Sequence, residues 1–167
     1  MTLEIVGIRE NENVSAWLLD LIESASNLKV ESIKMAFLNA FSALDYYIEE
    51  LYSILFEQYI EKYNLYSEKS PQDANYLKEK IRRYSNVGRN LLDDKLKDIW
   101  KETRNYNDNF NNIKGGLKQL VVKRNKLAHG ENVEIKKEDY GKLLYYFFDL
   151  ICLINKDEPL MDLLNSN

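Results

Sequence analysis

The sequence predicts an all-α protein, an up-and-down bundle of four main helices with short additional helices. The 167 residues include only six Gly and two Pro, so long stretches are free of helix breakers. Apolar residues recur at helical spacing in these stretches, and none shows a convincing strand alternation. This length fits a single helical domain over residues 1–167, with residues 157–167 as a short C-terminal tail that could add one docked turn.

The first half of the chain contains the longest predicted helix. A first amphipathic helix is expected over residues 12–28, and a second, of about eight turns, over residues 30–63. Tyrosines on or just after this long helix fit half-buried positions and a dimer interface equally well. They are Tyr46, Tyr47, Tyr52, Tyr59, Tyr63 and Tyr66.

A third helix has a clear start signal. Ser70 can cap it, Pro71 suits its first position, and the acidic Asp73 follows three residues after the cap. This helix should end near Tyr84.

The second half of the chain alternates helices with polar segments. A short helix fits residues 91–103, and the Asn-rich run 105–112 is typical of a loop. The next helix is expected over residues 116–129, with Gly130 ending it in a left-handed conformation. The last main helix should cover residues 137–155.

Charge and cysteine usage limit the function classes. The formal net charge of −4 argues against a protein that coats nucleic acid generally, so any such contact must be local. The segment from Lys114 to Gly130 is positive, with five basic residues and no acidic one. A second basic cluster, at residues 78–83, fits a solvated helix face. Cys152, the single cysteine, is expected to be a small buried hydrophobe. The chain is expected to be cytoplasmic, without a secretory signal or a membrane span.

The candidate site lies in the stretch Arg124-Asn125-Lys126-Leu127-Ala128-His129-Gly130, which holds the only histidine. Histidine can take and give a proton near neutral pH, and arginine suits a phosphate, so the stretch points to phosphodiester chemistry. Arg124 falls in the middle of an apolar helical stripe, where a charge is costly unless it is paired or faces a groove. That stripe consists of Leu117, Leu120, Val121, Leu127 and Ala128.

Structural roles are the alternative for both charged residues. Arg124 could form a salt bridge with Asp45 or Glu49, and His129 could stabilise the negative end of its helix. Arg124 and His129 are also separated by roughly 140° around a regular helix, whereas Asn125 and His129 share one edge. Either the helix unwinds near its end, or two copies of the chain combine their residues across a two-fold axis.

Other chemistries have little support in the sequence. One Cys and one His cannot form a usual zinc site, and no Gly-rich phosphate loop, serine nucleophile motif or paired-carboxylate motif is present. We therefore expect neither a metal nor a cofactor.

The pattern Arg124-Asn125-x-x-x-His129 resembles the R-x4-6-H motif of the HEPN superfamily, whose members often have a polar residue after the arginine. In that superfamily the motif lies near the end of a late helix of an all-helical bundle, and one more helix follows. The resemblance implies an HEPN-like fold and a metal-independent endoribonuclease that works as a homodimer with a composite site. It also implies a toxin or phage-defence effector, with a cognate antitoxin as a candidate partner. Glu131 stands where one branch has a tyrosine that antitoxins modify, so control by that route is not expected.

The implied mechanism is attack of an RNA 2′-hydroxyl on the adjacent phosphate. His129 would act as general base or acid, Arg124 would stabilise charge on the phosphate, and Asn125 would orient the histidine or hold a phosphate oxygen. Lys123 and Lys126 would bind the RNA backbone. The alternative function is a non-catalytic helical module that binds a nucleotide through the same pocket or a partner protein through its tyrosines.

Overall fold

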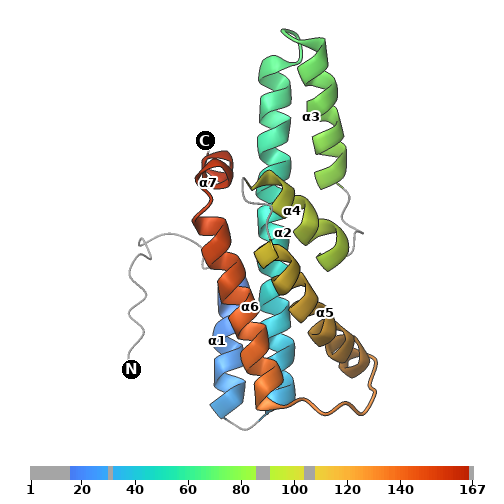
Figure 1. Cartoon of the computed structure of the whole chain (residues 1–167), viewed down its shortest axis with the longest axis vertical. Coiled ribbons are helices and arrows are strands. Elements are labelled where there is room, and N and C mark those ends of the chain that lie inside the picture. The colour runs from blue at the N-terminus through green and yellow to red at the C-terminus, as the bar shows by residue number, and fades with distance from the viewer. Residues whose placement is uncertain (1–15, 30–31, 86–90, 104–107, 166–167) are drawn as a thin grey trace.

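The computed structural model describes residues 16–29, 32–85, 91–103 and 108–165, and these residues form helices and short connections. Helix α2 (Ile33–Tyr66) is the spine of the molecule, 34 residues long as the unbroken apolar pattern predicts (Figure 1). Helix α1 (Ala16–Lys29), helix α5 (Asp108–Ala128) and helix α6 (Lys137–Asn155) pack around its first half. The predicted all-α bundle is therefore confirmed. Residues 12–15 and 30–31 of the first two predicted helices lie outside the described residues.

The core of the bundle is aromatic. Phe37 and Phe41 of α2 are almost fully buried. The ring of Trp17 on α1 lies 5.5 Å from that of Tyr47 on α2 and 6.0 Å from that of Phe147 on α6. These contacts bring three helices together around one centre.

Helix α3 (Pro71–Tyr84) runs beside the second half of α2, at the end of the molecule opposite the candidate site (Figure 1). The Ser70 side chain accepts a hydrogen bond from the Asp73 N–H at 3.4 Å, so the predicted cap is confirmed. Residues 91–103 begin as a π-helix, Leu91–Leu96, and continue as helix α4 (Lys97–Glu102).

The predicted loop over residues 105–112 is wrong for residues 108–112, which form the first turn of α5; residues 105–107 lie outside the described part of the chain. Phe110 and Ile113 are buried and continue the apolar stripe of Leu117 and Leu120 at helical spacing. Burial of this stripe outweighs the preference of asparagine for turns, because intrinsic propensity is a weak prior.

Two further expectations concern the end of the chain. Cys152 is exposed and not buried, because it lies on the side of α6 opposite the buried Leu150 and Ile154. The segment predicted as a tail contains helix α7 (Glu158–Leu164), whose Leu160 is fully buried. No helix among the described residues is long and apolar enough to cross a membrane.

Candidate functional site at the end of α5

The end of α5 is a regular helix terminus. The His129 N–H still donates to the Asn125 carbonyl at 3.0 Å, the Gly130 N–H donates to Leu127 at 3.1 Å, and the Glu131 N–H donates to Lys126 at 3.0 Å. Gly130 has a φ of 77°, as predicted for a glycine that ends a helix. The helix therefore does not unwind before His129, and Arg124 and His129 keep different directions around it.

The Arg124 side chain reaches across to α2. One guanidinium nitrogen donates to the Asp45 carboxylate at 2.5 Å, and another donates to the Asn125 side-chain oxygen at 3.1 Å. The guanidinium carbon lies 6.0 Å from the centre of the Phe41 ring. Of the two acids that the sequence offered as partners, Asp45 holds Arg124, whereas Glu49 pairs with Lys95.

The ion pair between Arg124 and Asp45 is only partly shielded from solvent. The two side chains are 37% and 29% exposed, respectively. Burial raises the pKa of the Asp45 carboxyl above its ordinary value, although Arg124 acts in the opposite direction. Because both side chains are partly exposed, solvent screens the pair and limits its contribution to stability.

His129 is exposed at the C-terminal end of α5, the position that the structural alternative gives it. Within one chain the structure therefore bonds the Arg124 side chain to Asn125 and directs it toward α2, while His129, one turn after Asn125, lies in a different direction from Arg124 around the helix. Lys126 is also exposed and open to a large ligand.

Lys123 has a partner that sequence reasoning missed. Its amine donates to both oxygens of Asp139 at 2.7 Å, and Asp139 also accepts the Lys136 N–H at the start of α6. Burial favours the neutral carboxyl, but these hydrogen bonds outweigh it and lower the pKa of Asp139. Asp139 stands three residues after Lys136, the N-cap of α6, which is a position favourable to acids. This position was the signal in the sequence that could have indicated the role of Asp139.

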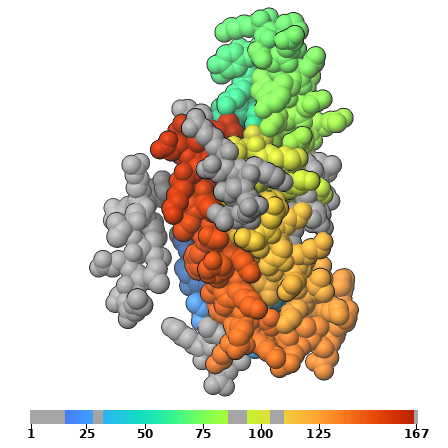
Figure 2. All heavy atoms as spheres, viewed as in Figure 1, coloured from blue at the N-terminus to red at the C-terminus, as the bar shows by residue number. Residues whose placement is uncertain are grey.

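Helices α5 and α6 lie side by side on the face shown in Figure 2. Their close approach depends on Gly116, because a Cβ atom there would lie 2.1 Å from the ring of Tyr146. This contact sets the spacing between the helix that carries the candidate site and the one that follows it.

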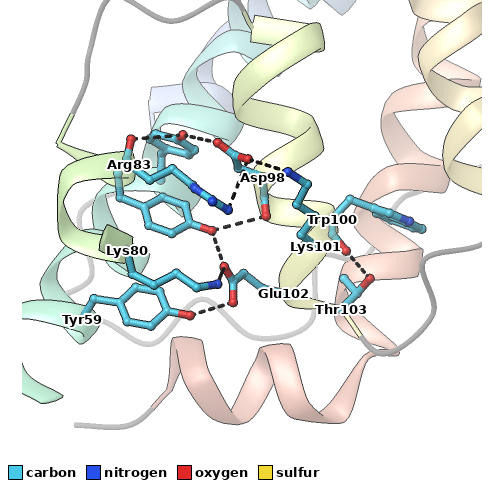
Figure 3. Close-up of polar contacts among 10 residues, drawn as sticks. Tyr59, Lys80, Arg83, Asp98, Trp100, Lys101, Glu102 and Thr103 are labelled. Carbon is cyan, nitrogen blue, oxygen red and sulfur yellow. Dashed lines mark hydrogen bonds and ion pairs between the residues drawn. The ribbon is translucent and has the colours of Figure 1, made fainter. Parts of the chain in front are cut away.

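The second basic cluster is not simply a solvated face. Lys80 donates to Glu102 at 2.5 Å, and the Tyr59 and Tyr84 hydroxyls donate to the same carboxylate at 2.6 and 2.7 Å (Figure 3). Arg83 lies 3.6 Å from Asp98. These partners join α3 to α4, whereas Lys78 and Arg82 of the cluster are exposed.

This network also explains several of the tyrosines. Burial, together with the nearby Glu102, raises the pKa of Tyr59 and Tyr84, which remain neutral donors. Tyr47, Tyr52 and Tyr59 are core residues, and their side chains are more buried than a half-buried position or a dimer interface would leave them.

Comparison with known proteins identifies the family. No curated protein and no solved structure matches the chain. The model of the RiboL-PSP-HEPN family matches residues 8–157, which include the end of α5 with Arg124, Asn125 and His129. With this match over most of its length and an all-helical bundle, the chain belongs to the RiboL-PSP-HEPN family of HEPN domains.

Proposed function

We propose that the protein is a metal-independent endoribonuclease whose site is built from Arg124, Asn125 and His129. The observation that carries the proposal is the placement of these residues at the exposed end of α5 in a chain of the HEPN family. Arginine, an amide and an imidazole are together sufficient for phosphodiester cleavage without a metal, since they supply charge stabilisation and proton transfer.

In the proposed reaction the RNA 2′-oxygen attacks the adjacent phosphorus and the bond from phosphorus to the 5′-oxygen breaks. His129 takes the proton from the 2′-hydroxyl or gives one to the leaving 5′-oxygen, a role worth about 10²- to 10⁴-fold in rate. Arg124 stabilises the additional negative charge on the phosphate, and Asn125 orients the reacting groups. Lys123 and Lys126 bind the RNA backbone, Lys123 in exchange for its contact with Asp139.

We further propose that the site is completed by a second copy of the chain. Helix α5 is regular up to Ala128, and the Arg124 side chain is held toward α2, so one chain does not align Arg124 with His129. A homodimer with two-fold symmetry allows the arginine of one copy to meet the histidine of the other. As a cytoplasmic ribonuclease the protein would act as a toxin or a phage-defence effector, in the former case with a cognate antitoxin.

A specific observation favours the alternative function, a non-catalytic helical module that binds a nucleotide or a protein. Arg124 is ion-paired with Asp45, and His129 stands at the C-terminal end of its helix, so Arg124 has the contact and His129 the position that a structural role requires. The two functions differ in whether RNA is cut.

The test is incubation of the purified protein with mixed RNAs in the presence of a chelator. The proposal predicts cleaved RNA with 2′,3′-cyclic phosphate ends, and loss of cleavage in His129→Ala and in Arg124→Ala while both variants retain the circular dichroism spectrum of the folded protein. Cleavage that the chelator stops, or full activity of His129→Ala, would contradict it. Folded protein that cuts no RNA but binds a nucleotide or a partner would favour the alternative.

A further inference from the structure

A cavity of about 190 Å³ opens between α2 and the end of α3. It is smaller than the roughly 300–1,000 Å³ of sites that enclose drug-sized ligands, so it suits one planar ring system and not a whole nucleotide. The residues that line it are Glu49, Tyr52, Ser53, Phe56, Tyr84 and Ser85.

The cavity has an aromatic floor and a polar rim. Tyr52 and Tyr84 are buried and form the floor: Lys95 lies over the Tyr52 ring, Tyr59 stacks on the Tyr84 ring, and the two hydroxyls are bonded to Asp98 and Glu102. Phe56 adds a half-buried ring. A partly exposed ring such as that of Phe56 can stack on an unpaired base, as aromatic side chains do in RNA complexes.

The rim supplies hydrogen-bonding groups. One carboxylate oxygen of Glu49 pairs with the buried Lys95, while the side chain as a whole is 45% exposed. Ser53 is exposed, and the Ser85 hydroxyl donates to the Arg82 carbonyl at 3.1 Å and so keeps its capacity to accept. The rim therefore offers a charged acceptor and two hydroxyls.

The cavity lies on the same side of α2 as the candidate site. Asp45, Glu49 and Phe56 are separated by four and seven residues, so they share one face of the helix. The lining residues of α2, Glu49 to Phe56, follow Asp45 by four to eleven residues, roughly 6–17 Å along the axis, which is a span of one to three nucleotides. A strand whose phosphate contacts Arg124 can thus place a neighbouring base over the cavity.

We propose that this cavity binds a guanine base and gives the protein its preference among RNA sequences. Guanine presents two adjacent N–H donors that suit the Glu49 carboxylate and a carbonyl acceptor that suits Ser53. Uracil presents a single N–H on its pairing edge with a carbonyl on each side, and the carboxylate repels these two carbonyl oxygens. The part of the proposal that concerns RNA sequence rests on the proposed ribonuclease function. The binding of the base to the cavity does not depend on that function.

The test compares binding of 5′-GMP and 5′-UMP, which differ only in the base, to the full chain by calorimetry. The proposal predicts a dissociation constant at least about tenfold lower for GMP, a difference of one well-placed hydrogen bond to a charged group. Ser53→Trp should block the cavity and abolish GMP binding, while Ser26→Trp, at an exposed serine of α1, should leave it unchanged. Glu49→Gln should remove most of the preference for GMP, and Glu57→Gln, at an exposed position of α2, should retain it.

Equal binding of the two nucleotides, no binding of either, or unchanged GMP binding in Ser53→Trp would overturn the proposal. If Ser53→Trp does not fold, the pair Glu49→Gln and Glu57→Gln decides the question. A preference for GMP in a protein that cuts no RNA would support the cavity and contradict the ribonuclease. A protein that cuts RNA but shows no preference for GMP would support the ribonuclease and contradict the cavity.

Discussion

Replacing Asp45 by asparagine separates the two roles open to Arg124. The substitution preserves the shape of the side chain and removes its charge from a contact of 2.5 Å with the guanidinium. Two unit charges at that distance attract by about 1.7 kcal/mol at the dielectric constant of water, before any cost of desolvation. Because both side chains are partly exposed, solvent screens this attraction, and we expect a net contribution of about 1 kcal/mol or less, as in other partly exposed pairs.

For a domain of this length, a loss of 1 kcal/mol lowers the melting temperature by about 2–4 °C. Thermal and denaturant unfolding of Asp45→Asn, Arg124→Ala and the double variant should therefore give a coupling energy of about 1 kcal/mol or less. The ribonuclease proposal also predicts that Asp45→Asn continues to cut RNA, since Arg124 remains. A coupling energy of several kcal/mol would refute this reasoning, because that is the behaviour of a buried structural pair.

Two other predictions concern packing and pH. Gly116→Ala should lower the free energy of unfolding by about 1–3 kcal/mol, because the Tyr146 ring must turn away. Gly115→Ala, with open space around it, should raise the free energy of unfolding by up to about 1 kcal/mol. Urea unfolding of both variants checks this, and equal effects would contradict it. Because Lys123 helps to lower the pKa of Asp139, the ionised carboxylate stabilises the fold above its ordinary pKa of 3.8, and this contribution is lost as the pH falls through the lower pKa of the folded state. The advantage of the wild type over Asp139→Asn should accordingly be present at pH 7 and diminish as the pH falls below 3.8, and an advantage independent of pH would show that the charge is not its source.

Helices with local start and stop signals were predictable from the sequence. The cap and Pro71 mark the start of α3, and the last main helix begins and ends at Lys137 and Asn155, as its apolar spacing predicts. The start of α5 was missed because its Asn-rich first turn favours loops locally, while burial of Phe110 decides the outcome.

Contacts between distant parts of the chain were harder to predict from the sequence. The sequence indicated that Arg124 needs a partner and offered two, and only the packing of α5 on α2 selects Asp45. The network around Glu102 was not predictable from the sequence, because Tyr59 and Lys80 come to it from two other helices. Periodicity reports which side of a helix is buried, but it does not report which helix covers that side.

The most direct test of the central claim is a mixing experiment with Arg124→Ala and His129→Ala. Each purified variant alone should fail to cut RNA in chelator. After the two are mixed and allowed to exchange subunits, cleavage should return in part, because a mixed dimer retains one intact arginine and one intact histidine at the shared site. Cleavage by either variant alone, or a mixture that remains inactive although mixed dimers are shown to form, would contradict a composite site made from Arg124 and His129.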